Sequence, residues 1–247
     1  MFVMSKSEKE LLVCNDITIC YDKKNVLENL SMSVCEGDYI SIVGENGTGK
    51  SSLIKGILGL VPLKTGQIKY ENGMEKKHIG YLPQNTENQS SFPASVFEII
   101  LSGTLTGKKF KPFYTAEDKK AVYEVMEKLG ISEYRKEKFG NLSGGQKQRV
   151  MLSRAMVSAQ KILFLDEPVT GHDPVVTAEF YDLIHELNQK EKIAVVMVSH
   201  DMENSMKYAN KILQMSENDY FFGTKDEYLS RQRTLPIPNV VNNNKTV

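Results

Sequence analysis

The feature that most constrains this chain is one eight-residue segment, Gly44-Glu45-Asn46-Gly47-Thr48-Gly49-Lys50-Ser51. It fits the pattern G-x-x-x-x-G-K-[ST], and it lies directly between an apolar run at 39–43, which predicts a strand, and a predicted helix from about residue 50. Glycines let the backbone curl so that several N–H groups point at a phosphate, and the helix N-terminus adds a favourable dipole. The segment therefore predicts a phosphate-binding loop inside an α/β fold.

Two side chains of this loop have distinct expected roles. Lys50 is predicted to reach the β- and γ-phosphates of a nucleotide, and the hydroxyl of Ser51 is predicted to bind Mg²⁺. Ser52, the next residue, is included among the nucleotide contacts with the whole loop. A phosphate loop alone indicates only nucleotide binding, which kinases, GTPases and many ATPases share, so other motifs must decide the function.

Composition disfavours some classes of partner without excluding a local charged patch. Among the 247 residues, 31 Lys and Arg balance 31 Asp and Glu, so no overall field attracts nucleic acid or anionic lipid. The longest apolar runs, such as 193–198, are far shorter than the roughly 18 residues that indicate a membrane span. The start, MFVMSKSEKE, lacks the pattern of a signal peptide. Any role at a membrane is therefore expected to come through a partner protein.

Hydrophobic patterns divide the chain. Strand-like runs at 39–43, 162–165 and 193–199 alternate with helical patterns, which is the rhythm of an α/β core with a parallel sheet. Between them, 95–101, 117–129 and 143–158 read as helices without a strand, with Thr115 as a cap and Gly130 as a stop. We expect an N-terminal extension (1–10), a core in two parts (11–84 and 161–231), an inserted helical subdomain (85–160) and a loose tail (232–247).

A second motif stands at the end of the helical region, where Leu142-Ser143-Gly144-Gly145-Gln146 opens a helix. This pentapeptide resembles the signature of the ATP-binding-cassette family. Its hydroxyl, its glycine N–H groups and the helix dipole behind them suit a second phosphate contact. Ser143 also reads simply as a helix N-cap.

The third motif is the apolar run 162–165 followed by two carboxylates, Asp166 and Glu167. It resembles the Walker B segment and the catalytic glutamate of the same family. The resemblance implies that Asp166 holds Mg²⁺ and that Glu167 orients or deprotonates the attacking water.

Three single residues match the family at other positions. His200, in Val-Ser-His-Asp, matches the switch histidine near the γ-phosphate, and Gln84, in Tyr-Leu-Pro-Gln, matches the glutamine that contacts Mg²⁺ or water. Tyr21 matches the aromatic residue that stacks on adenine. Gln84 also reads as a polar loop residue, and Tyr21 as an ordinary strand residue. His78 and His185 match no motif and are predicted to be exposed.

One position departs from the family pattern. His172 stands in the dimer-contact loop where an apolar residue is expected, while Asp173 is retained. Either the imidazole makes that contact sensitive to pH or the substitution is tolerated.

The resemblance runs from about residue 11 to 229. It implies a P-loop NTPase (RecA-like) α/β core with an antiparallel β subdomain and an inserted α-helical subdomain. It also implies an ATP hydrolase with ATP and Mg²⁺ as cofactors. Two copies are expected to meet head to tail, so that Ser143 and Gly145 of one copy face the ATP that Lys50 of the other holds. A transmembrane permease is the expected partner, with Phe92 or Phe97 as a contact.

The amino-acid sequences of residues 92–103 and 167–183 most resemble those of the ATPase subunits of bacterial zinc or manganese importers. That resemblance implies an extracellular metal-binding protein in the same system, and a cytoplasmic location on the inner face of the cell membrane. The alternatives are an ATPase for another cargo and a cassette acting on nucleic acid or ribosomes. The even charge disfavours nucleic acid. An inactive cassette is disfavoured because Lys50, Asp166, Glu167 and His200 are all present.

Overall fold

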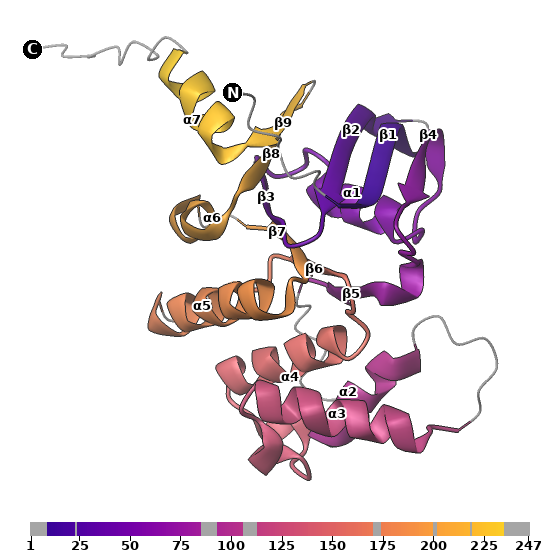
Figure 1. The fold of residues 1–247 in the computed structure, drawn as a ribbon, viewed down its shortest axis with the longest axis vertical. Helices are drawn as coiled ribbons and strands as arrows, with labels where there is room; N and C mark the ends of the chain where they lie inside the picture. The colour runs from indigo at the N-terminus through magenta and orange to yellow at the C-terminus, as the bar shows by residue number, and fades with distance from the viewer. Residues whose placement is uncertain are drawn as a thin grey trace, which may run out of the picture.

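A computed structural model describes residues 9–22, 24–84, 93–105, 113–169, 174–199, 202–217 and 219–234. Its strands form two sheets, a three-stranded one in the order β2-β1-β4 and a six-stranded one in the order β5-β6-β7-β3-β8-β9. Figure 1 shows the smaller sheet at one end of the molecule, the larger sheet through its middle, and a cluster of helices at the other end.

The smaller sheet is antiparallel, as expected. It consists of β1 (Glu10–Tyr21), β2 (Lys24–Cys35) and β4 (Leu63–Tyr70), with β1 paired to both neighbours. One face of β1 and β2 buries apolar side chains in a core shared with α1 (Lys50–Ile57) and with strands of the larger sheet. The smaller sheet therefore covers the helix that follows the glycine-rich loop.

The larger sheet carries the motifs. Five strands are parallel and the sixth, β9, is antiparallel to β8. All five residues of β6 and of β7 are buried, which explains their continuous apolar runs, because a parallel sheet is covered on both faces. Its strands are β3 (Tyr39–Gly44), β5 (Ile79–Leu82), β6 (Ile162–Asp166), β7 (Ala194–Val198), β8 (Lys211–Met215) and β9 (Tyr220–Thr224).

Helices cover the larger sheet and form the separate cluster. α5 (Pro174–Glu191), α6 (Met202–Tyr208) and α7 (Lys225–Thr234) belong to the C-terminal half. The cluster contains α2 (Val96–Ser102), α3 (Ala116–Lys128) and α4 (Gly144–Met156), as Figure 1 shows. Short 3₁₀ turns lie at Lys76–His78 (η1), Gly103–Leu105 (η3), Ser132–Tyr134 (η4) and Phe139–Asn141 (η5).

The predicted helix signals of α3 are confirmed. Thr115 is its N-cap, and its side chain accepts a hydrogen bond from the backbone N–H of Asp118, whose carboxylate reaches back to the N–H of Thr115. Gly130 follows the helix with φ of 65°, a left-handed conformation that ends helices.

Two predictions are corrected. α7 extends to Thr234, so the tail expected from 232 begins within a helix. His185 is not an exposed side chain, because its ring stacks on that of Tyr208 with centroids 4.6 Å apart and its Nδ1 is buried. The packing of α5 on α6 brings the two rings together. None of the helices in the described ranges is long and apolar enough to cross a membrane.

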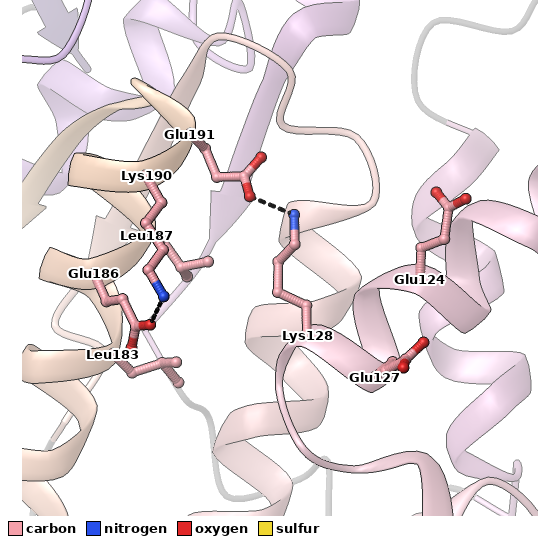
Figure 2. Close-up of a pocket in the computed structure, with 8 residues that line it drawn as sticks. All are labelled: Glu124, Glu127, Lys128, Leu183, Glu186, Leu187, Lys190 and Glu191. Atoms are coloured by element: carbon pink, nitrogen blue, oxygen red, sulfur yellow. Dashed lines mark hydrogen bonds and ion pairs between the residues drawn. The ribbon is translucent and has the colours of Figure 1, made fainter.

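A cleft of about 420 Å³ lies between α3 of the helix cluster and α5, beside the core that the cluster shares with the larger sheet. Figure 2 shows Lys128 of α3 reaching across it to Glu191 of α5, with a distance of 2.7 Å between Nζ and Oε1. The leucines of α5, Leu183 and Leu187, form its apolar wall. The ion pair is thus a side-chain link between two parts of the fold.

We expect Lys128→Glu to lower the free energy of unfolding by about 0.5 kcal/mol, because both partners are 38% exposed and such pairs contribute little. Adding Glu191→Lys should restore most of the loss. Urea unfolding of the two single variants and the double variant would check this, and additive single effects would show that the two charges do not interact.

Candidate nucleotide site

The site forms where neighbouring parallel strands end at the same edge of the sheet. β7 lies between β6 and β3, with Asp166 opposite Val198 and Ile42 also opposite Val198. Ligands of open α/β sheets bind beyond the carboxyl ends of the strands. The end of β3 leads into the glycine-rich loop, and the end of β6 supplies the two predicted carboxylates.

At two positions the loop needs glycine both for its backbone angle and for the close approach of a neighbouring strand. Gly44 has φ of 148°, and a β-carbon there would lie 2.1 Å from the carbonyl oxygen of Met215. Gly49 has φ of 91°, and a β-carbon there would lie 2.5 Å from the carbonyl oxygen of Val26. The glycines therefore let β2 and β8 pack directly against the loop, as well as letting the loop curl.

Lys50 lies beneath this curl with only 5% of its surface exposed. Its Nζ donates to the carbonyl oxygens of Gly44 at 2.9 Å and Glu45 at 2.7 Å. Burial lowers the pKa of the Lys50 ammonium, and the charges of Glu167 and Asp166 oppose that shift. A buried ammonium held mainly by carbonyl groups is suited to receive an anion.

The N-terminus of α1 fits a phosphate group as well. Its N-cap, Gly49, has no side chain and makes no capping hydrogen bond. In contrast, α2, α3 and α4 are capped by the side chains of Ser95, Thr115 and Ser143. The first N–H groups of α1 thus lack the acceptor that the other three helices have, and a phosphate oxygen satisfies such groups.

Asp166 brings together the oxygen atoms that could hold Mg²⁺. Its Oδ1 accepts from the hydroxyl of Ser51 at 3.0 Å, and its Oδ2 accepts from the hydroxyl of Tyr81 at 3.4 Å. The residue is 2% exposed, and burial raises the pKa of its carboxyl, while the bond from Ser51 opposes that shift. Carboxylate and hydroxyl oxygens are hard ligands that suit Mg²⁺, so the oxygens of Asp166 and Ser51 fit the ion.

Glu167 adopts a backbone conformation that is rare outside glycine, with φ of 48°. Its backbone N–H donates to the carbonyl oxygen of Val198 at 3.1 Å, which ties the strained turn to β7. Its Oε2 accepts from Nε2 of Gln84 at 2.8 Å. Gln84 therefore contacts the carboxylate of Glu167 in this structure, next to Asp166. Backbone strain of this kind is common at functional sites.

Other predicted residues lie further away. Tyr21 ends β1 with 40% of its surface exposed, so its ring is open to a stacking partner. Ser143 caps α4 through a reciprocal pair of bonds with Gln146, as the simpler interpretation expected. In Figure 1, α4 lies in the helix cluster and α1 beside the smaller sheet, so a single chain keeps the signature apart from the loop.

His200, His172, Asp173 and Phe92 lie outside the described residues. Phe97 is described, and its ring contacts that of Tyr123 in the helix cluster with centroids 5.3 Å apart.

Sequence patterns did not identify two residues at the site. Tyr81 reaches Asp166 from the strand that precedes Gln84. Gln148 of α4, which is 2% exposed, donates from Nε2 to the carbonyl oxygen of Pro168, next to Glu167. Because side chains alternate along a strand, the sequence predicts that Tyr81 lies on the opposite face of β5 from Gly80 and Leu82. It does not predict that the Tyr81 hydroxyl reaches Asp166. No local signal indicates the contact of Gln148. Within the described ranges, no group of three or more His, Cys, Asp or Glu residues could hold a metal ion.

Comparison with known proteins gives a consistent result. The sequence model of the family described as ABC transporter matches residues 27–170. A zinc uptake system ATP-binding protein, ZurA of Listeria monocytogenes, is 33% identical over 89% of this chain and 88% of its own length. A manganese transport system ATP-binding protein, MntB of Bacillus subtilis, is 36% identical over 85% of this chain and 84% of its own length.

Solved structures show the same architecture. The ADP conformation of MJ1267, an ATP-binding cassette of an ABC transporter, superimposes with a TM-score of 0.76 at 26% identity. The match covers 90% of this chain and 94% of that one.

Proposed function

The chain belongs to the ABC transporter ATPase family, and from that premise we propose that it powers a bacterial importer of zinc or manganese. The family makes it the ATP-binding and ATP-hydrolysing subunit of a transporter, whose partner is a membrane permease. One observation carries the proposal for the site: Lys50, Ser51, Asp166 and Glu167 come from distant parts of the sequence and meet at one edge of the sheet.

For ATP, we propose contacts along the whole loop. Its glycines and the N–H groups of α1 would surround the phosphates, with Lys50 at the β- and γ-phosphates. Tyr21 would stack on the adenine ring. The contacts are expected from Tyr21, Gly44, Glu45, Asn46, Gly47, Thr48, Gly49, Lys50, Ser51 and Ser52.

For Mg²⁺, we propose Ser51, Asp166 and Gln84 as the groups that hold it, directly or through water. When bound, the ion supplies charge neutralisation for the phosphates. Asp166 needs no large movement for this role, since Ser51 already contacts it. Gln84 would have to exchange its present bond to Glu167 for one toward the ion or its water.

Glu167 would act as the general base. Its carboxylate follows Asp166 directly at the end of β6, where it could accept a proton from the attacking water. The backbone N–H of Glu167 is bonded to the carbonyl oxygen of Val198, which holds the residue at the end of β6 beside the loop. His200 would contact the γ-phosphate and help to polarise it.

Two copies are proposed to close on ATP. The signature residues Ser143, Gly144, Gly145 and Gln146 of one copy would then face the phosphates held by the loop of the other. The helical subdomain (85–160) would transmit this closure to the permease, and Phe97 would lie near the surface that contacts the permease. The protein would lie in the cytoplasm at the inner face of the cell membrane.

The cargo proposal rests on the relatives, which are named for zinc and for manganese systems. As in the importer systems that the sequence resembles, a metal-binding protein outside the cell would deliver the ion to the permease. Transport of another cargo is the second candidate, because other subunits select it.

The cargo is tested in liposomes that hold this chain and its permease. ATP hydrolysis is expected to rise when the binding protein carries zinc or manganese, and not when it is metal-free. A complex with Lys50→Ala should show neither hydrolysis nor stimulation, while Lys120→Ala, which changes an exposed lysine of α3, should behave like the wild type. Equal hydrolysis with metal-free and loaded binding protein would contradict the metal importer and leave the ATPase assignment intact.

A further inference from the structure

The carboxylate of Asp166 is fixed by one hydroxyl on each oxygen. Ser51 donates to Oδ1 at 3.0 Å, and Tyr81 donates to Oδ2 at 3.4 Å. Because Asp166 is almost completely buried, these bonds replace water that would otherwise solvate the charge. Rotation of the carboxylate about its Cβ–Cγ bond would break both bonds at once.

Ser51 is expected to bind the ion when the site is filled, whereas Tyr81 is not expected to contact the ion. Tyr81 belongs to β5, which is the edge strand of the larger sheet and lies next to β6. Tyr81 pairs with Phe164 in that register, two residues before Asp166. A side chain from β5 can therefore lean along the sheet and reach the end of β6 from the side.

The backbone that carries Tyr81 is firmly held. At Gly80, a β-carbon would lie 2.4 Å from the carbonyl oxygen of Ala155 and 2.5 Å from the side chain of Ala159. β5 at Gly80 thus packs closely against the backbone of α4 and the methyl group of Ala159, which leaves no room for a larger side chain. Since side chains alternate along a strand, Gly80 faces α4 while Tyr81 packs on the opposite face, in the core with α1.

The ring of Tyr81 lies between the core and a cavity. It packs on that core and also lines a cavity of about 420 Å³, together with Leu60, Ile79 and Arg154. Removal of the hydroxyl would therefore leave the ring in place and create no clash. The oxygen is the part of this side chain that the core does not require.

We propose that Tyr81 is a positioning residue that orients the carboxylate of Asp166 for Mg²⁺. This rests on the proposed function, in which Asp166 holds the ion. Oriented ligands bind a metal more tightly, because partners in the surrounding shell remove the cost of orienting them. Tyr81 acts through Asp166 and touches neither nucleotide nor ion.

The test is Tyr81→Phe, with Tyr70→Phe as the matched control. Tyr70 is also half-buried, and its hydroxyl donates to the carbonyl oxygen of Ile57, away from the carboxylates. Calorimetry would measure the affinity for ATP in EDTA and in Mg²⁺, and an assay would give the Mg²⁺ concentration for half-maximal hydrolysis. Thermal melting would confirm that both variants fold.

For Tyr81→Phe we expect unchanged ATP affinity in EDTA and a Mg²⁺ requirement raised by about three- to tenfold, the effect of losing one hydrogen bond of ordinary net strength, since this bond is long at 3.4 Å. Tyr70→Phe should match the wild type in both measurements. A purely structural role would lower stability and leave the Mg²⁺ requirement unchanged, and that result would overturn the inference.

Asp166→Asn separates this inference from the function on which it rests. If Asp166→Asn raises the Mg²⁺ requirement and Tyr81→Phe does not, the role of Tyr81 is wrong and the proposed site stands. If neither variant changes the requirement, the assignment of Asp166 to Mg²⁺ fails, and the inference fails with it.

Discussion

Glu167→Gln is expected to lower ATP hydrolysis by about a hundred- to ten-thousandfold, the typical contribution of a positioned general base. ATP affinity should change little, because the carboxylate is proposed to act on water and not on the nucleotide. The substitution keeps the length of the side chain and its amide oxygen can still accept the bond from Gln84. The loss would therefore report the missing base and not a rearranged site.

The measurement is steady-state hydrolysis combined with size-exclusion chromatography in ATP and Mg²⁺. If closure traps ATP between two copies, Glu167→Gln should elute as a dimer under these conditions and the wild type should not accumulate in that form. Glu127→Gln, on the exposed side of α3, is the control and should keep wild-type activity. Activity of Glu167→Gln close to that of the wild type would assign the base to another residue.

The parts of the site that the sequence predicted are those whose physics is local. The curl of the loop depends on glycines within eight residues, and the strands β3, β6 and β7 follow from short apolar runs at the predicted places. The cap at Thr115 and the stop at Gly130 are equally local, since both act on the ends of one helix. Patterns of this length contain the information that a local structure needs.

The contacts between distant residues could not be predicted in this way. Gln84 and Glu167 are 83 residues apart, and Tyr81 and Asp166 are 85 apart. Each pair meets only because β5 lies beside β6, and the sequence gives no register for that pairing. The stacking of His185 on Tyr208 likewise depends on how α5 packs against α6.

The smaller sheet was expected from the family resemblance and not from periodicity. Strand β1 changes register four times against β2, and twice against β4. Each irregularity shifts the alternation of buried and exposed side chains, so a period of two is lost over a strand of this length. In β6 and β7 the alternation is absent for another reason, which is burial on both faces.

The second large effect is expected from Asp166→Asn, which should act in opposite directions on activity and stability. Removing a charged ligand of the proposed Mg²⁺ site should lower hydrolysis by about a hundredfold or more, as a loss of electrostatic stabilisation of the transition state does. In EDTA, however, the variant should melt at a higher temperature than the wild type. Burial raises the pKa of the Asp166 carboxyl, so in the absence of a cation the ionised form destabilises the fold.

The difference in stability between Asp166→Asn and the wild type should depend on pH. Because the folded-state pKa of Asp166 is raised, the folded protein binds this proton more tightly than the unfolded chain does, and wild-type stability falls as pH rises through that pKa. Asn has no proton to lose, so the advantage of the variant should be largest near pH 7 and disappear below about pH 4, where aspartate is protonated in both states. A gain of about 1 kcal/mol would raise the melting temperature by roughly 2–4 °C.

Asp38→Asn is the matched control for a buried aspartate with a cation beside it. Its carboxylate lies 3.0 Å from Nζ of Lys211 and accepts a bond from the backbone N–H of Cys35 at 2.7 Å. Breaking a buried pair leaves the cation uncompensated, so this variant should melt at a lower temperature than the wild type.

Addition of ATP and Mg²⁺ should then stabilise the wild type and Asp38→Asn more than Asp166→Asn, because binding to the folded state alone raises stability. We expect the charge of Asp166 to favour metal binding and to destabilise the fold when no cation is bound. If Asp166→Asn melts below the wild type in EDTA at pH 7, the carboxylate stabilises the fold even without a cation, and this expectation is wrong.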